Sequence, residues 1–395
     1  MADSLPAEVN DRIIDFLYDD ARALAACSLT CQAWLPTARY HRWANTRLRS
    51  FRVPRFIELL VGSPSLATYV TGLEFQSRVG SFGRRTNTLM KCNPVELDML
   101  LNRLPFLHHL SLESWHIEEE LAVVARANRT FQALKSLSFV QCDFTTLNTA
   151  AALMVTPSLT SISLCNLEDL SSELPWIPEI GTRPSIQRLS LSGLQSRAIC
   201  DLFEWFPRCI SSFEIQIQSE EDVPVAGRML SKIGSSGTLT ELDLLVDTDN
   251  NLQAVFGGSE FSLECLLELR KCRLAFNLRE MFVAGNMSLP WITTIIGQLS
   301  SKHLEEITLS IRADNLQDLR ALDSECGVRE TYPVQYDDLE ALDWEALGSS
   351  IVYQLPKLRR VTIEGRGDPL YFLSFMSIQH PKLRGLLQLR TVKEQ

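Results

Sequence analysis

Apolar side chains recur along most of this chain in one six-residue pattern, leucine-x-x-leucine-x-leucine, in which other large apolar residues sometimes replace leucine. Copies begin at Leu107, Leu134, Leu159, Ile186, Ile210, Leu239, Leu304 and Leu358. A degenerate copy begins at Val70, and we align another on Glu264, Leu267 and Leu269. Because apolar and polar residues alternate at the end of each copy, each copy predicts a short strand with one buried face.

Helical patterns fill the intervals between the predicted strands. They cover residues 95–104, 118–131, 146–155, 196–206, 223–233, 289–299 and 338–355. Up to residue 264, the strand–helix unit recurs at a period of roughly 20–29 residues, and over residues 65–390 the chain resembles an irregular leucine-rich-repeat array. The predicted fold is therefore an α/β solenoid whose parallel strands form a curved, concave sheet.

Two of the ten cysteines fall at the end of a repeat, Cys142 and Cys272. In leucine-rich repeats a small buried residue at this position meets free backbone groups where the chain leaves the strand. We expect structural roles for both thiols. Cys27 and Cys31 lie one helical turn apart, a spacing that fits either a metal site or packing in the core. Because no second pair of ligands follows at a suitable spacing, core packing is favoured.

The first fifty residues have a different pattern, that of short helices. Val9, Ile13, Phe16 and Leu17 recur at helical spacing. A second helix is predicted from Leu24 to Trp34, ended or kinked at Pro36, and a third stretch holds Tyr40, Trp43 and Leu48. A helical unit of this size buries too little apolar surface to be stable alone. It must dock on the following domain, on another protein, or on both.

The residues of these helices resemble an F-box, most closely the fungal form. The resemblance rests on the segments LPAEV from residue 5, IIDFL from residue 13 and LAACSLTCQAW from residue 24, followed by Arg39, His41 and Trp43. Thr30 and Gln32 depart from the usual valine and arginine. The resemblance implies binding of a Skp-type adaptor and, through it, of a cullin–RING ubiquitin ligase of the SCF type. The adaptor-binding positions it implies are Leu5, Pro6, Val9, Ile13, Leu17, Leu24, Leu29 and Trp34.

A target protein would bind on the concave face, where the x positions of the strands point. The central x position gives one predicted column, Ser111, Ser138, Ser163, Ser190, Glu214, Asp243 and Glu268. One explanation of this column is structural, because small polar residues fit a crowded concave sheet whether or not the sheet binds a target. The functional hypothesis is that Glu214, Asp243 and Glu268 receive a basic segment of the target.

Composition narrows the classes of function. The net charge of −10 disfavours nucleic-acid binding, and no apolar stretch is long enough to span a membrane. The first residues include Asp3 and Glu8 and lack a basic region, so no signal peptide is expected and the cysteines are expected to be reduced, in cytoplasm or nucleus. His108 and His109 are adjacent on a strand, a poor geometry for joint metal binding.

The sequence therefore predicts a protein that is not an enzyme and that needs no cofactor or metal. The first hypothesis is a substrate receptor of an SCF-type ligase. The alternative is a leucine-rich-repeat scaffold with an F-box-like cap, outside any ligase. The predicted domains are an F-box over residues 1–48, a linker or cap over 49–69 and the repeat array over 70–395, with an acidic insertion at 313–345.

Overall fold

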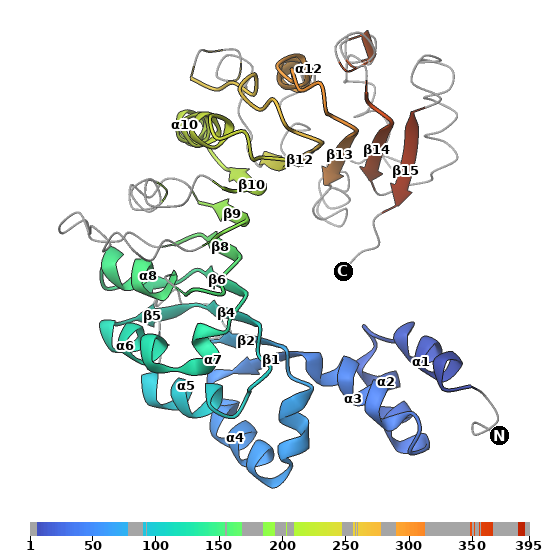
Figure 1. Cartoon of the computed structure of the whole chain (residues 1–395), viewed down its shortest axis with the longest axis vertical. Coiled ribbons are helices and arrows are strands. Elements are labelled where there is room, and N and C mark those ends of the chain that lie inside the picture. The colour runs from blue at the N-terminus through green and yellow to red at the C-terminus, as the bar shows by residue number, and fades with distance from the viewer. Residues whose placement is uncertain are drawn as a thin grey trace, which may run out of the picture. The chain divides into compact units, whose positions relative to one another are not determined.

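The computed structural model describes residues 6–77, 90–91, 93–154, 156–167, 185–193, 203, 209–246, 256, 258, 260–277, 290–312, 348–349, 351, 355, 357–365 and 386–391. The chain forms two compact units. Unit 1 comprises Met1–Ile186 and Ser196–Pro207, and unit 2 comprises Gln187–Gln195 and Arg208–Gln395. Figure 1 shows the helices and strands of both units.

Unit 1 begins with three short helices, α1 (Ala7–Asp15), α2 (Ala21–Thr30) and α3 (Leu35–Ala44). The α2 helix begins where it does because the Asp20 side chain accepts hydrogen bonds from the backbone N–H groups of Arg22 and Ala23, both at 2.9 Å. The predicted continuation of the second helix to Trp34 is wrong. Helix α2 ends at Thr30, and Pro36 lies in the first turn of α3, where a missing N–H costs nothing.

A parallel sheet follows in unit 1. Its strands are β1 (Asn45–Arg49), β2 (Gly72–Gln76), β4 (His109–Glu113), β6 (Ser136–Val140) and β8 (Ser161–Cys165), paired in that order. A second parallel sheet joins β3 (Met90–Lys91), β5 (Trp115–Ile117) and β7 (Asp143–Phe144). The first sheet confirms the predicted parallel arrangement, whereas the second sheet was not predicted.

The connections of unit 1 contain the helices α4 (Val53–Gly62), α5 (Pro94–Leu101), α6 (Glu119–Ala127), α7 (Arg129–Gln132) and α8 (Leu147–Met154), and the 3-10 helices η2 (Ser50–Arg52) and η3 (Pro64–Thr68). Neighbouring helices of the series α4, α5, α6 and α8 contact one another, along one side of the sheet (Figure 1). Each strand thus pairs with the next strand, and each helix packs on the next helix, as in a repeat array.

The first strand was not expected. The sequence pattern placed Leu48 in a helical stretch, whereas Thr46 and Leu48 are buried in β1 beside Leu73 and Phe75 of β2. Trp43, Thr46 and Leu48 have the spacing of a repeat copy, but only one of them is a leucine. Trp43 stacks on Phe56 of α4 with ring centroids 6.2 Å apart, which joins α3 to the repeats.

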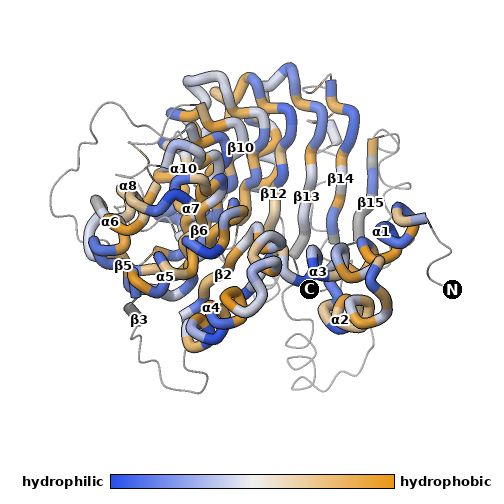
Figure 2. Tube along the Cα trace, turned by 60° about the horizontal axis from the view of Figure 1, so that its bottom comes forward, coloured by the Kyte–Doolittle hydropathy of each residue, from blue (hydrophilic) through white to orange (hydrophobic). Residues whose placement is uncertain are grey.

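Unit 2 contains a second parallel run, β9 (Arg188–Ser192), β10 (Ser212–Ile217), β11 (Glu241–Val246), β12 (Lys271–Asn277), β13 (Glu306–Arg312), β14 (Arg360–Gly365) and β15 (Leu387–Thr391). Its longer described helices are α10 (Asp222–Gly234) and α12 (Pro290–Gly297). Figure 2 shows hydrophobic and hydrophilic residues alternating along these strands. The side chains on the apolar face, such as Leu242, Leu244 and Ile307, are buried.

Cys142 has the role that the repeat pattern predicted. Its Sγ is fully buried, donates to the carbonyl oxygen of Leu112 at 3.2 Å, and lies 3.5 Å from that of Val140. Burial raises the pKa of the Cys142 thiol to about 12, so the thiol is neutral at physiological pH. Cys27 is likewise buried, in a small core with Ile14, Leu24 and Ala38.

The register of β12 corrects the repeat alignment. Glu264, Leu267 and Leu269 lie before the strand, and Cys272 and Leu274 pair with Leu242 and Leu244 of β11. The repeat copy therefore consists of Leu269, Cys272 and Leu274, with a buried cysteine in place of the middle leucine. Cys272 belongs to the strand and does not end the repeat. Desolvation raises the pKa of its thiol to about 12.

Candidate functional site

The central x positions form two columns, one in each unit. In unit 1, Ser111, Ser138 and Ser163 are partners in the strand register, next to Glu74 of β2. In unit 2 the column runs through Ser190, Glu214, Asp243, Arg273, Thr308, Thr362 and Gln388. Six of the seven predicted column residues therefore lie on the expected strand positions.

Glu268 is the exception. It lies in a turn before β12, exposed, with its carboxylate 4.0 Å from Nε2 of His303. Arg273 takes the column position beside Asp243 that the sequence pattern gave to Glu268. The predicted acidic stretch of three residues is thus interrupted by a cation.

Arg273 is the centre of a polar network on the strands of unit 2. Its Nη1 donates to Asp243 Oδ2 at 2.8 Å, and its Nη2 donates to Ser310 Oγ at 2.9 Å and to Glu364 Oε2 at 3.2 Å. Burial acts to lower the pKa of Arg273, but the hydrogen bonds and charges of Asp243 and Glu364 outweigh it and raise that pKa. Asp243 is therefore neutralised within the sheet, which weakens the case that it binds a basic target.

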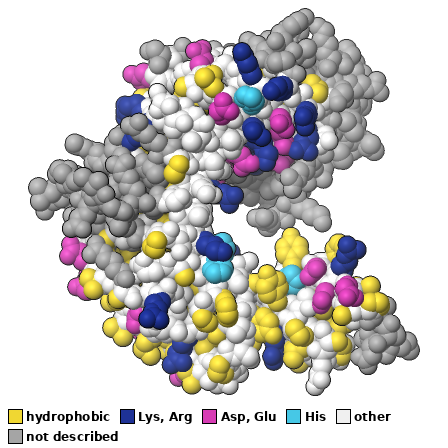
Figure 3. Space-filling model, in the orientation of Figure 1, with side chains coloured by type: hydrophobic (Ala, Val, Ile, Leu, Met, Phe, Trp, Pro, Cys, Tyr) yellow, Lys and Arg dark blue, Asp and Glu magenta, His cyan; other side chains and the backbone are white. Residues whose placement is uncertain are grey.

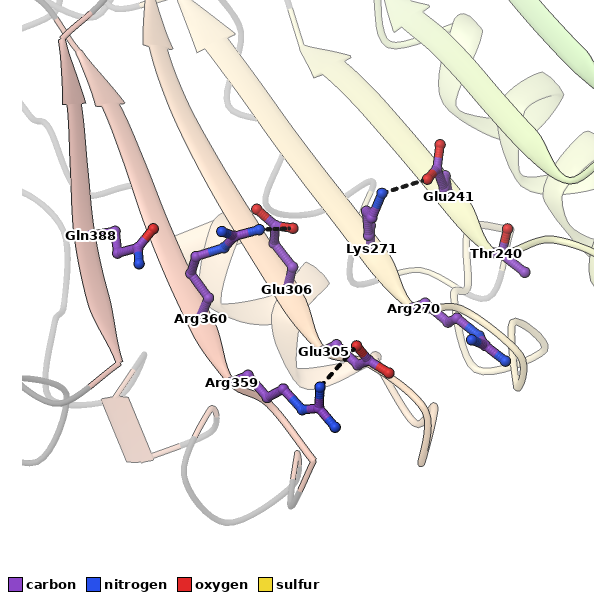
Figure 4. A pocket seen from close by; sticks show the side chains of 9 residues that line it. All are labelled: Thr240, Glu241, Arg270, Lys271, Glu305, Glu306, Arg359, Arg360 and Gln388. Carbon is purple, nitrogen blue, oxygen red and sulfur yellow. Dashed lines mark hydrogen bonds and ion pairs between the residues drawn. The ribbon is translucent and has the colours of Figure 1, made fainter.

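A pocket of about 610 Å³ opens beside this network, where β11 to β14 begin. We call it the rim pocket; Thr240, Glu241, Arg270, Lys271, Glu305, Glu306, Arg359, Arg360 and Gln388 line it. Figure 4 shows these side chains on neighbouring strands and on the residues just before them. In Figure 3, basic and acidic side chains interleave over this part of unit 2.

Charge alternates from strand to strand in the rim pocket. Lys271 Nζ lies 2.7 Å from Glu241, and Arg359 Nη1 lies 3.8 Å from Glu305. Arg360 and Glu306 form a third pair between β14 and β13. Sequence reasoning noted the acids Glu241, Glu305 and Glu306 beside the central column but missed the bases that pair with them. The signal was present in the adjacent pairs that precede or begin the strands, such as Glu305–Glu306 and Arg359–Arg360.

The N-terminal helices offer a second candidate surface. Ile14 and Leu24 lie in the small core with Cys27 and Ala38, and Leu17 and Trp34 pack against it partly buried. Pro6, Val9, Ile13 and Leu29 are exposed, whereas Leu5 lies outside the described residues. The predicted adaptor positions thus divide into an exposed set and a set that holds the helices together.

Helix α1 and the residue that follows it, Phe16, expose apolar side chains on a face that adjoins the core face of the helix. Val9 is 42% exposed, Ile13 40% and Phe16 84%. These residues are spaced four and three apart, so they share one side of the helix. Hydrophobic side chains are visible on the surface of the α1–α3 module in Figure 3. Phe16 was part of the helical pattern but not of the predicted adaptor set, and its exposure places it with Val9 and Ile13.

Polar contacts fix α1 against α3. His41 Nε2 of α3 lies 2.7 Å from Asp15 Oδ1, and the Thr37 hydroxyl donates to Asp11. Both acceptors are on α1. These contacts fix the orientation of α1 relative to α3, and therefore also the position of its exposed apolar stripe.

Within the described part of the chain, no three His, Cys, Asp or Glu side chains gather as metal ligands would. The same residues include no helix with the length and apolar character needed to span a bilayer.

Comparisons with known proteins find similar solved structures. A scan of protein-family models and a search of curated proteins find no match. The chain is similar in structure to one in the solved "Crystal structure of Rad7 and Elc1 complex in yeast", with 14% sequence identity and a TM-score of 0.33. The match covers 98% of this chain and 93% of that chain. The fold assignment rests on the parallel strands and repeats of the chain itself.

Proposed function

We propose that this protein is a receptor subunit that binds an adaptor of an SCF-type cullin–RING ligase through α1–α3 and a target protein through its repeat array. It contributes no catalytic group. It would raise the local concentration of target lysines near the ubiquitin-loaded enzyme of its partners.

The exposed apolar stripe of α1 is the observation that carries the adaptor half of the proposal. A helix packed on one side only is expected to be polar over the rest of its surface. Helix α1 and its C-terminal flanking residue instead expose the apolar side chains of Val9, Ile13 and Phe16. The F-box-like motif covers the same helices, which supports an adaptor as the occupant. The repeat array supports the other half, because arrays of this kind bind proteins through their strand-borne polar surface.

Charge introduction on α1 tests the adaptor interface. We expect Val9→Asp combined with Ile13→Asp to weaken binding of a purified Skp-type adaptor at least tenfold, since each anchor in an interface contributes about 1–3 kcal/mol. Binding is measured by isothermal titration calorimetry with the full chain. Because both side chains are exposed, the helical circular dichroism should stay unchanged.

Val123→Asp is the matched control, since Val123 is 65% exposed on α6, outside the N-terminal helices. The control should bind the adaptor like the original chain. Equal affinity of the Val9→Asp/Ile13→Asp variant would exclude α1 as the interface. Adaptor binding without recruitment of the cullin to the complex would favour the scaffold alternative.

A further inference from the structure

The charges of the rim pocket are arranged in two layers. In each of its three ion pairs the base is more exposed than the acid. The exposed fractions are 58% and 43% for Lys271 and Glu241, 79% and 44% for Arg359 and Glu305, and 44% and 20% for Arg360 and Glu306. A molecule that enters the pocket from solvent therefore meets ammonium and guanidinium groups before carboxylates.

The three acids, although less exposed than their partners, do not occupy all the hydrogen-bond donors of the bases. A guanidinium carries five N–H donors and an ammonium three, and one carboxylate occupies at most two of them. The remaining donors of Arg359, Arg360 and Lys271 are available to a ligand. The glutamates hold these bases in place, which lowers the entropy cost of binding an anion.

Arg270 adds a positive charge that no acid balances. The pocket lining contains four bases and three acids. Each acid pairs with one base, and among the described residues Arg270 forms no ion pair with a carboxylate. Arg270 is exposed, and Figure 4 shows its guanidinium extending away from the paired residues. The pocket thus has a local net charge of +1 in a chain of net charge −10.

We propose that the rim pocket binds an anionic segment of the target protein, with a carboxylate or phosphorylated side chain on Arg270, Arg359 and Arg360. This deepens the proposed function, on which it rests, by naming the chemistry of the target. It also reverses the expectation of a basic target, since Asp243 is neutralised by Arg273 and Glu268 lies off the strand. Arg is suited to this role because its planar fork matches carboxylate and phosphate groups.

Peptide binding to the full chain tests the proposal. The probes are fluorescein-labelled twelve-residue peptides of alternating Ser and Glu, of alternating Ser and Lys, and of Gly and Ser with two phosphoserines. We expect the glutamate peptide, the phosphoserine peptide, or both, to raise the fluorescence anisotropy, with an affinity that falls as salt is added. The lysine peptide should not bind.

Arg270→Ala combined with Arg359→Ala should weaken anionic peptide binding at least tenfold. Arg228→Ala combined with Arg188→Ala removes the same charge from exposed residues of unit 2 outside the pocket lining, and should change the affinity less than twofold. Tighter binding of the phosphoserine peptide would identify a phosphorylated target, and equal binding an unmodified acidic one.

Three results would overturn the inference: preference for the lysine peptide, no binding of either anionic peptide, or equal losses in the two double variants. Adaptor binding is measured on the same samples. If it persists while the anionic peptides fail to bind, the inference is wrong and the adaptor half of the proposed function stands.

Discussion

Gly227 shows how tightly single positions are constrained where α10 packs in unit 2. A Cβ atom at Gly227 would lie 1.9 Å from the backbone oxygen of Glu260, and backbone cannot swing aside as a side chain can. Only glycine allows this close approach of α10 to residues 260–261.

We therefore expect Gly227→Ala to lower the free energy of unfolding by about 1–3 kcal/mol, the range for overpacking a well-packed site. The measurement is urea unfolding followed by circular dichroism. Gly297→Ala is the control, because Gly297 ends α12 and its added Cβ would have open space. The control should be neutral or slightly stabilising, since alanine favours helix. Equal effects of the two substitutions would contradict the packing argument.

Arg273 is a polar residue whose role likewise depends on its tertiary neighbours. In sequence it is one of many charged residues, and the leucine pattern placed it outside the expected column. The register of β12 brings it to Asp243, Ser310 and Glu364, which lie on three other strands. No local pattern predicts such partners, because they come together only when the strands align.

At the scale of elements, the ends of several strands share one backbone conformation. The residue directly after the strand has positive φ in four repeats, with values of 59° at Ser114, 52° at Gln141, 48° at Asn166 and 71° at Gly193. This left-handed conformation is easy for glycine and costs other residues about 1–2 kcal/mol, less for asparagine. Ser114 and Gln141 therefore hold strained turns at the ends of β4 and β6.

Gln141→Gly should raise the free energy of unfolding by about 0.5 kcal/mol, since relief of the strained turn exceeds the added entropy of the unfolded chain. The backbone hydrogen bond from Gln141 N to the carbonyl oxygen of Cys165, at 2.8 Å, is retained. Gly193→Ala is the reverse change and should lower stability by about 1 kcal/mol. Chemical denaturation measures both, and a loss of stability in Gln141→Gly would contradict the strain argument.

At the scale of the whole molecule, the two proposed surfaces belong to different units. The apolar stripe of α1 lies in unit 1 and the rim pocket in unit 2. Their chemistry also differs, since one is apolar and the other charged. The two surfaces share no residue, and substitutions without shared partners usually have additive effects.

We accordingly expect the Val9→Asp/Ile13→Asp variant to bind the anionic peptides within twofold of the original chain, and the Arg270→Ala/Arg359→Ala variant to bind the adaptor within twofold. Calorimetry and anisotropy on both variants test this in the same buffer. A loss of both activities in either variant, with unchanged circular dichroism, would show that the surfaces are coupled.

The amino-acid sequence by itself determined the α/β repeat fold, most strand positions and the helical N-terminus. These features depend on local periodicity, because a strand with one buried face buries alternate residues and a packed helix buries one side. Even so, the pattern missed β1 and misaligned the repeat copy at β12. On the buried face, threonine replaces leucine in β1 and cysteine replaces leucine in β12.

Only the tertiary structure decided which charged residues meet and which apolar residues stay exposed. Leu24 and Leu29 look equivalent in the sequence, yet Leu24 is 1% exposed and Leu29 is 87% exposed. The rim pocket combines residues from segments as far apart in the sequence as Thr240 and Gln388. The physical reason is that ion pairing and burial depend on distances across the sheet and between helices, which a one-dimensional pattern does not contain.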